Sequence, residues 1–303
     1  MKLKTLPNTV IHVGGPTASG KTDLAIELAQ LFDTEIISSD SRQLYKEMSI
    51  GTAVPSEHEL GRVKHHFIHS HSVHHPISAG VFALSAKQKI DELHKTTSCV
   101  IVVGGSPLYS DALLYGLDDF PPIPKEFIQR LELQENDALY EQLKQVDPKT
   151  ALSIDPYNSR RIIRALSISL FTGKPYHSYL NTRKPQFEHI IEVGIEWPRE
   201  RLYERINRRV DLMINQGLIE EARALHPLKE LSSLQTVGYQ ELFEYFEEKL
   251  TLDDAIDKIK QHSRNFAKRQ LTWYRKKKAF KWFPAQTLST ETILKFLKDS
   301  QLV

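Results

Sequence analysis

Eight residues near the amino terminus have the types and the spacing of a phosphate-binding loop. The segment Gly15-Pro-Thr-Ala-Ser-Gly-Lys-Thr22 fits the pattern G-x-x-x-x-G-K-S/T between an apolar run and a helical one. Its glycines let backbone N–H groups point inward, and the helix start adds a positive dipole end. We predict that Lys21 reaches the outer phosphates of a polyphosphate and that the Thr22 hydroxyl holds Mg²⁺. The predicted phosphate-binding residues are Gly15, Pro16, Thr17, Ala18, Ser19, Gly20, Lys21 and Thr22.

One carboxylate, that of Asp40, follows the end of an expected strand near this loop. A nucleotide hydrolase normally has a second apolar strand that ends in an acidic residue and helps to hold magnesium. Here the run from Val100 to Val103 ends in Gly104-Gly105-Ser106. Asp40 is therefore either the metal-side acid of a small-molecule kinase or a group with another role, and the residues alone leave both possibilities open.

Two basic clusters have the composition of nucleic-acid contacts. From Arg264 to Lys281 there are eight lysines and arginines and no acid, with Trp273 and Tyr274 among them. Cations bind phosphates, and aromatic rings stack on bases. We assign Trp273 to the core, because it recurs with Phe266 and Gln270 at helical spacing. The predicted RNA contacts are Lys268, Arg269, Arg275, Lys276, Lys277 and Lys278, and in a second cluster Arg160, Arg161 and Arg164.

The elements that must position these residues alternate between strand and helix. Such an alternation, with continuously apolar strands, favours a parallel sheet covered by helices on both faces. We therefore predict an α/β fold with a P-loop-type parallel sheet and a helical insertion domain. The expected strands cover residues 10–13, 35–38, 100–103, 189–197 and 280–283, and the expected helices cover 21–32, 77–95, 199–225 and 252–277, with one more at the end.

The domain boundaries follow from where this alternation stops. Three prolines follow Asp118, and no convincing strand appears before His189. We predict a core domain of residues 1–117 and 188–303, interrupted by a helical insertion of residues 118–187 that contacts RNA. The two basic clusters would then hold a stem-loop from both sides.

The composition is that of an ordinary globular protein. Of 303 residues, 40% are hydrophobic and 26% are charged, and the net charge is only +2, so a nucleic acid must meet a local basic patch. The single cysteine, Cys99, excludes an internal disulfide and lies in an apolar run, where we expect it buried. The start of the chain does not resemble a signal peptide, and no apolar stretch reaches membrane-spanning length. We expect a cytoplasmic protein.

Five stretches beyond the phosphate-binding loop resemble the tRNA dimethylallyltransferase family, also called the isopentenyl-diphosphate:tRNA transferases. With that loop they run in the family's order from residue 15 to residue 275, and the ordered set is highly specific. They are Ser39-Asp-Ser-Arg-Gln-Leu-Tyr45 with Met48-Ser-Ile-Gly-Thr-Ala53, Val103-Gly-Gly-Ser-Pro-Leu-Tyr109, Asn158-Ser-Arg-Arg-Ile-Ile-Arg-Ala165, Val237-Gly-Tyr-Gln-Glu241, and Phe266-Ala-Lys-Arg-Gln-Leu-Thr-Trp-Tyr-Arg275.

The resemblance implies a reaction and its participants. The loop would hold the diphosphate of dimethylallyl diphosphate with Mg²⁺, and the prenyl group would pass to N6 of adenine 37 in the tRNA anticodon loop. The tRNAs would be those that read codons beginning with U. We expect a monomer that binds the anticodon stem-loop and no membrane.

The resemblance also implies roles for single residues. Asp40 would accept a proton from the adenine amine, and Arg209 would contact the diphosphate. Ser106 would keep a hydroxyl near the amine, although the family usually has threonine there and glycine at the position of Pro107. The implied tRNA contacts in this part of the chain are Asp40, Ser41, Arg42 and Gln43, and the resemblance adds Ile162 and Ile163 to the arginines of the second basic cluster.

Several alternatives remain open. Asp40 would be an ordinary helix cap if it had no catalytic role, and Arg209 would lie on a solvated face. Six histidines between His65 and His75 invite a zinc site, but their spacing fits no zinc pattern well, and we expect a surface loop near the prenyl pocket. The rival functions are a small-molecule kinase, an isopentenyltransferase that acts on free adenine nucleotides, and an RNA-binding module with an inactive loop.

Overall fold

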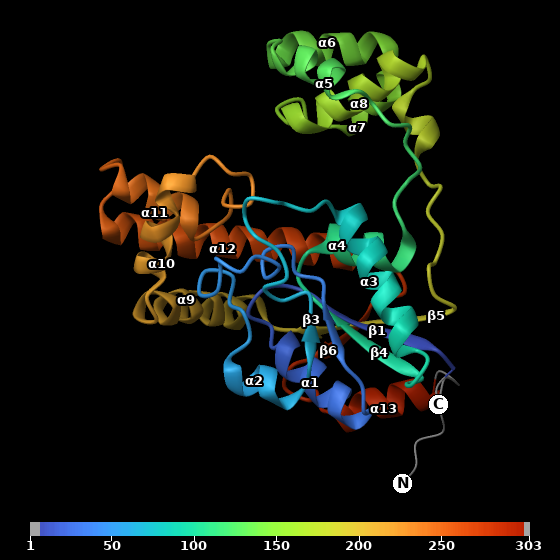
Figure 1. Cartoon of the computed structure of the whole chain (residues 1–303), viewed down its shortest axis with the longest axis vertical. Coiled ribbons are helices and arrows are strands. Elements are labelled where there is room, and N and C mark those ends of the chain that lie inside the picture. Colours follow the sequence, from blue (N-terminus) through green and yellow to red (C-terminus); the bar gives the residue numbers. More distant parts are fainter. Residues whose placement is uncertain (1–6, 300–303) are drawn as a thin grey trace. The chain divides into compact units, whose positions relative to one another are not determined.

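A parallel sheet forms the centre of the larger of two compact units (Figure 1). The computed structural model describes residues 7–299, and within them the strand order is β3-β2-β4-β1-β5-β6, with every neighbouring pair parallel. This arrangement confirms the predicted α/β fold. The strands are β1 (Thr9–Gly14), β2 (Ile36–Ser38), β3 (His65–His66), β4 (Cys99–Val103), β5 (His189–Glu196) and β6 (Lys281–Pro284).

The central strands β1 and β4 are buried along their whole length because both faces of the sheet are covered, and β1 includes the buried polar residues Thr9 and His12. On one face, α1 (Lys21–Leu31) and α13 (Thr290–Asp299) pack against the strands through residues such as Leu24 and Ile293. On the other face lie α3 (Ala79–Leu93), α4 (Pro107–Tyr115) and α12 (Leu252–Arg275) (Figure 1).

Two strand glycines let α12 approach this second face. A Cβ atom at Gly14 would lie 3.0 Å from the Tyr274 ring, and one at Gly194 would lie 2.4 Å from the Phe280 ring. Tyr274 and Phe280 pack on each other and on His12 of β1. Glycine at both strand positions therefore makes room for the rings that fix the end of α12.

A second apolar cluster joins the helices that follow β5. It contains residues of α9 (Arg199–Asn215), α10 (Leu218–Leu225), α11 (Tyr239–Phe246) and the first half of α12. The loop after β2 joins this cluster through Tyr45 and Met48. The expected single helix over 199–225 is divided at Gly217, whose φ of 99° is left-handed, and the short 3-10 helix His226–Leu228 follows α10.

Residues 115–184 form the second compact unit, which has a core of its own. Its apolar centre contains Leu131, Leu139, Leu143 and Leu166. The predicted insertion, residues 118–187, begins and ends three residues later than this unit. The helices are α5 (Lys125–Glu132), α6 (Asn136–Val146), α7 (Pro148–Ser153), α8 (Ser159–Thr172) and the 3-10 helix Tyr176–Tyr179.

Three local features were not predicted from the sequence. A short helix, α2 (Glu57–Arg62), begins at a capping box formed by Ser56 and Glu59. The histidine-rich segment is not entirely a loop, because His65–His66 form the edge strand β3. Pro107 begins α4, and its missing N–H costs nothing at a first helical position. Across residues 7–299, every helix is too short or too polar for a membrane span.

Candidate active site

A cavity of about 900 Å³ opens at the edge of the sheet where β1, β2 and β4 end. The carboxyl ends of parallel strands meet at one edge, and ligands of such sheets bind in the crevice there. The phosphate-binding loop after β1, the loop with Asp40 after β2 and the loop with Ser106 after β4 all line this cavity, as do α9 and α12. The strand order thus brings together residues that lie far apart in the sequence.

The phosphate-binding loop curls through three left-handed residues. The φ angles are 130° at Gly15, 60° at Ala18 and 94° at Gly20, and α1 begins at the next residue, Lys21. The first N–H groups of a helix have no partner within it and attract anions. The cavity is lined by Thr17 to Thr22, whereas Gly15 and Pro16 belong to the approach from β1.

The carbonyl groups of the loop are held by side chains outside it. The Trp197 indole donates to the carbonyl of Ser19 (2.9 Å), and the Arg205 Nε donates to that of Ala18 (2.7 Å). Within the loop, the Lys21 ammonium donates to the carbonyl of Pro16 (2.5 Å). With these carbonyls bound, the loop keeps a fixed curl before a ligand arrives.

Three charged groups meet at the cavity. Burial lowers the pKa of Lys21 to about 7, with a further decrease from Arg209 and an opposing increase from Asp40. The pKa of Arg209 is lowered as well, because the effect of burial is larger than the opposing effect of the Asp40 carboxylate. The Arg209 Nη1 donates to the Thr17 hydroxyl (3.1 Å). Arg209 therefore lies against the phosphate-binding loop, as a diphosphate contact would require, and not on a solvated face.

Asp40 combines a local role with an open position. Its Oδ1 accepts a hydrogen bond from the Arg42 N–H (2.9 Å), so one oxygen caps the turn that follows. Within residues 7–299 the structure shows no hydrogen bond to Oδ2. The carboxylate is half-buried and lines the cavity. Residues 41–47 form turns and no helix, so Asp40 is a turn cap and not the helix cap of the alternative interpretation, and it leaves one carboxylate oxygen for a ligand.

Ser106 connects two of the loops. Its Oγ accepts from the Ser41 N–H (3.0 Å) and donates to the Ser41 hydroxyl (3.0 Å). The loop after β4 is therefore bonded to the residue next to Asp40. This arrangement depends on a hydroxyl at position 106, which serine supplies.

Two residues that we predicted to contact tRNA form hydrogen bonds within the protein. The Arg42 guanidinium donates to the carbonyl of Ser233 (2.8 Å), and the Gln43 amide donates to that of Ala53 (2.9 Å). Both residues, like Ser41, line the cavity. Arg42 and Gln43 thus fix neighbouring loops with the same groups that we expected to meet RNA.

The cluster at the end of α12 needs two corrections. Lys277 is not a free phosphate contact, because its ammonium lies 2.5 Å from Asp111 and 2.6 Å from Glu192, and its side chain is 16% exposed. Trp273 is only half-buried and donates to Asp111 (2.9 Å), while Tyr274 is the buried ring. The positions of the others agree with solvent-facing cations: Lys268, Arg269, Lys276 and Lys278 are exposed, as is Arg275, which pairs with Glu196 (3.2 Å).

The predicted RNA contacts of the helical unit also separate into two kinds. Arg160, Arg161 and Arg164 of α8 are exposed. Ile162 is fully buried in the core of its own unit, so its assignment as an RNA contact was wrong, and Ile163 packs against the same core. A helix must bury one face, and the isoleucines supply it here.

The side chains of the histidine-rich segment and of Cys99 make contacts within the fold. His69 bonds to the Ser49 hydroxyl (3.2 Å), and His66 pairs with Glu35. His65 lines the cavity. In the part of the chain that the structure describes, no group of three or more metal-ligating side chains occurs. Burial raises the pKa of the Cys99 thiol to about 12, so Cys99 is the buried hydrophobe we expected.

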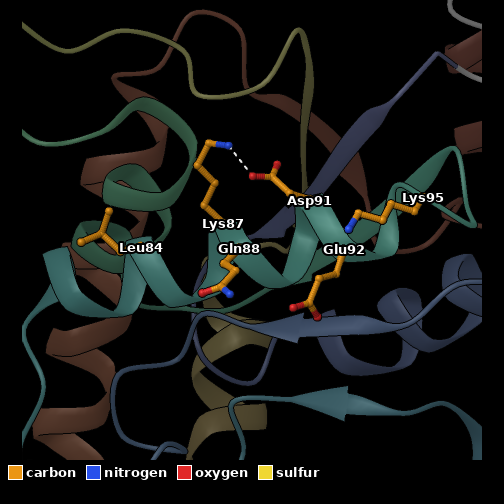
Figure 2. Close-up of a pocket in the computed structure, with 6 residues that line it drawn as sticks. All are labelled: Leu84, Lys87, Gln88, Asp91, Glu92 and Lys95. Carbon is orange, nitrogen blue, oxygen red and sulfur yellow. Dashed lines mark hydrogen bonds and ion pairs between the residues drawn. The ribbon is translucent and has the colours of Figure 1, made fainter.

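A second, shallower hollow lies over α3 and has no comparable set of groups (Figure 2). Its charges compensate one another: Lys87 pairs with Asp91 (2.7 Å), and Glu92 pairs with Lys89. An exposed helix with such i,i+3 and i,i+4 pairs is an ordinary solvated surface. The cavity at the strand ends is therefore the candidate active site.

Two residues with central positions were missing from the prediction. Gln270 of α12 bonds to both the phosphate-binding loop and the loop after β4. Glu221 of α10 accepts hydrogen bonds from three consecutive N–H groups, those of Ser49, Ile50 and Gly51. The sequence signals for Gln270 were its helical spacing with Phe266 and Trp273 and its position in the stretch 266–275 that resembles the family, whereas Glu221 had none.

Comparisons with known proteins agree with this geometry. The sequence model of the IPP transferase family matches residues 43–277. A "tRNA dimethylallyltransferase" of Christiangramia forsetii is 49% identical over 284 residues, which cover 92% of this chain and 94% of the relative. One of Flavobacterium johnsoniae is 45% identical over 298 residues, with coverages of 94% and 96%.

Solved structures have the same fold. The tRNA isopentenylpyrophosphate transferase of Bacillus halodurans matches with a TM-score of 0.72 and 35% identity, covering 97% of each chain. A eukaryotic dimethylallyltransferase acting on tRNA matches with a TM-score of 0.82 and 26% identity, covering 97% of this chain and 79% of its own. The fold and these relatives define an α/β enzyme of the prenyltransferase class. The chain belongs to the IPP transferase family.

Proposed function

We propose that this enzyme transfers a dimethylallyl group from dimethylallyl diphosphate to N6 of adenine 37 in the anticodon loop of tRNAs that read codons beginning with U. The observation that carries the proposal is the single cavity in which Lys21 and Arg209 at the phosphate-binding loop face the carboxylate of Asp40. The relatives named above act on tRNA by name, which supports this choice of acceptor.

The reaction requires a leaving diphosphate and a nucleophilic amine. The N6 lone pair forms a bond to C1 of the prenyl group while the bond from C1 to the diphosphate oxygen breaks and its electrons go to that oxygen. Lys21, Arg209 and the N–H groups at the start of α1 stabilise the charge that develops there. Asp40 accepts the proton that N6 loses, a contribution of about 10²–10⁴-fold to the rate.

The cavity also offers a place for the hydrocarbon group. Apolar side chains, among them Val103, Met213 and Leu218, line it together with the charged residues. A pocket with apolar walls and a few convergent polar groups is typical of small-molecule sites. The five-carbon group would lie on these walls, away from water that would otherwise attack it.

Magnesium fits the donors at the phosphate-binding loop. Mg²⁺ binds through one or two protein oxygens and takes its other ligands from phosphates and water. The Thr22 hydroxyl at the start of α1 lines the cavity and is one such oxygen. Bound there, the ion would neutralise part of the charge on the leaving diphosphate.

Exposed cations on α12 support an RNA acceptor over a free nucleotide. Lys268, Arg269 and Lys276 are exposed, and Arg269 also lines the cavity. A tRNA bound by its backbone phosphates would turn the unstacked adenine into the cavity, since its amine is inaccessible in a stacked loop. We expect this reaction to take place in the cytoplasm. We also expect a monomer to perform it, because one chain supplies both the donor loop and the base.

A parallel assay tests the proposal. Purified protein with Mg²⁺ and radiolabelled dimethylallyl diphosphate is given unmodified tRNA with adenines at positions 36 and 37, AMP, or ATP. We expect transfer to the tRNA alone, and nearly complete loss of turnover in Asp40→Asn with tRNA affinity kept. Labelled AMP or ATP would support a free-nucleotide acceptor. A parallel reaction with γ-labelled ATP would support the kinase if it transferred phosphate.

A further inference from the structure

The Gln270 side chain lies between two loops of the cavity. Its Oε1 accepts a hydrogen bond from the Thr17 N–H (2.9 Å), and its Nε2 donates to the carbonyl of Gly105 (2.5 Å). The residue is 2% exposed. Both ends of the amide are therefore satisfied by main-chain groups of segments that lie more than 160 residues away in the sequence.

These two loops carry the two sides of the reaction. Thr17 receives the hydrogen bond from Arg209 and belongs to the donor side. Gly105 precedes Ser106, which is bonded to Ser41 beside Asp40 on the acceptor side. We propose that Gln270 is a positioning residue that sets the distance between the leaving diphosphate and the base. The inference rests on the proposed function and adds a residue to its machinery.

The surroundings of Gln270 are shaped for this side chain. A Cβ atom at position 105 would lie 2.5 Å from the Gln270 Nε2, so a side chain there would displace the amide from its hydrogen bond to the carbonyl. The hydrogen bond to Oε1 also removes the Thr17 N–H from the set that can face phosphate. The diphosphate is then bound by the N–H groups after Thr17, up to the start of α1.

The pairing distinguishes an amide from a carboxylate. Gln270 needs an acceptor toward Thr17 and a donor toward Gly105. An ionised glutamate offers two acceptors and repels the Gly105 carbonyl, whereas a protonated glutamic acid reproduces both bonds. Burial against a carbonyl favours the protonated form, and the nearby cations oppose it. The charged groups that line the cavity with Gln270 are Lys21, Asp23, Asp40, Arg42, Glu59, Arg205, Arg208, Arg209 and Arg269, with His65 as a further titratable group.

Three variants of the full-length protein test the inference in single-turnover prenyl transfer to tRNA. We expect Gln270→Met to lower the rate by about 10- to 100-fold, because small misplacements of reacting groups have effects of that size. Its tRNA affinity should stay within about twofold, since no RNA contact is lost. The control is Gln261→Met on the exposed face of the same helix, which should transfer at the native rate.

The decisive variant is Gln270→Glu, measured against the native enzyme from pH 8 down to pH 5.5. The ratio of its rate to the native rate should rise by about 10-fold as the carboxyl takes up its proton, and the ratio for Gln270→Met should stay flat. Dividing by the native rate at each pH removes any pH dependence that the two enzymes share.

Each outcome decides the matter. A Gln270→Met enzyme at the native rate, or a Gln270→Glu ratio as flat as that of Gln270→Met, would overturn the positioning role while the native enzyme still transfers prenyl. A native enzyme that transfers no prenyl group to any tRNA would overturn the proposed function, and this inference with it.

Discussion

The Arg209 guanidinium donates a hydrogen bond to the Thr17 hydroxyl over 3.1 Å, although 192 residues separate the two in the sequence. The bond joins α9 to the phosphate-binding loop and directs a permanent positive charge at the place where phosphates would lie. Arginine suits this role because its planar group can donate to the hydroxyl and to a phosphate oxygen together.

Removing this charge should slow the chemical step. We expect Arg209→Ala to lower kcat by about 10²–10³-fold, the usual effect of losing one group that stabilises developing negative charge. Arg209→Lys keeps a charge but loses the fork, so its rate should fall between those of the native enzyme and Arg209→Ala. Steady-state kinetics with tRNA and dimethylallyl diphosphate provide the measurement. An unchanged kcat with a raised donor KM would show that Arg209 only binds the substrate.

Donor binding should take up a proton at Lys21. The pKa of Lys21 is lowered to about 7 before a ligand binds. A bound diphosphate favours the charged form and raises this pKa, so uptake should approach about one proton at pH 8 and vanish toward pH 6, where Lys21 is already protonated. Calorimetry of diphosphate binding in buffers of different ionisation enthalpy measures the uptake.

The matched control for this proton is Lys21→Arg. A guanidinium stays charged at both pH values, so the variant should show no uptake that depends on position 21. Equal proton uptake by the native enzyme and Lys21→Arg at pH 8 would mean that Lys21 does not titrate in this range.

The sequence was most informative where structure depends on neighbouring residues. Strand β4 was predicted because it is continuously apolar, β1 because it is mostly apolar, and the phosphate-binding loop because its motif is local. Strand β3 was missed because it has two residues and is defined only by its pairing with β2. The site residues gathered as expected at the strand ends, since a parallel sheet places all of those ends at one edge.

The missed and misassigned residues depend on contacts across the fold. Gln270 acquires its role from Thr17, 253 residues away, and Lys277 is removed from the surface by Glu192, 85 residues away. A basic segment in the sequence shows which residues carry charge, but it does not show which of them forms an ion pair with a buried carboxylate. Ile162 was misassigned for the same reason, because its position in a basic motif concealed that it faces the core of its unit.

Two neighbouring lysines should therefore differ sharply. Lys277→Met removes the cation from beside Asp111 and Glu192, whose side chains are 7% and 2% exposed, and should lower the free energy of unfolding by about 3–5 kcal/mol. Lys276→Met lies on the surface and should change stability by less than about 0.5 kcal/mol. It should instead weaken tRNA binding and reduce the salt dependence by about one phosphate contact. Denaturant unfolding and tRNA titrations at several salt concentrations separate the two effects.

The same network predicts how stability depends on pH. Burial would raise the pKa of Glu192, but His12 and Lys277 lower it to about 2, against an ordinary value of 4.5. A carboxylate with a lowered pKa stabilises the fold above its ordinary value, and this contribution is lost as the pH falls from about 4.5 to about 2. Lys277→Met should lose less stability over that range than the native enzyme does. Parallel pH curves for the two proteins would contradict the pairing.

Glu221 should stabilise the wall of the cavity through the loop after β2. Its carboxylate accepts the N–H groups of Ser49, Ile50 and Gly51, each at 2.9 Å, and the Tyr239 hydroxyl at 2.7 Å. An amide would point its NH₂ at one of these donors, so even Glu221→Gln should lower the free energy of unfolding by about 1–3 kcal/mol. Because Gly51 lines the cavity, the donor KM should rise as well. The neighbouring Glu220→Gln, on the exposed side of α10, should change neither quantity, and equal stability of the two variants would show that Glu221 does not hold this loop.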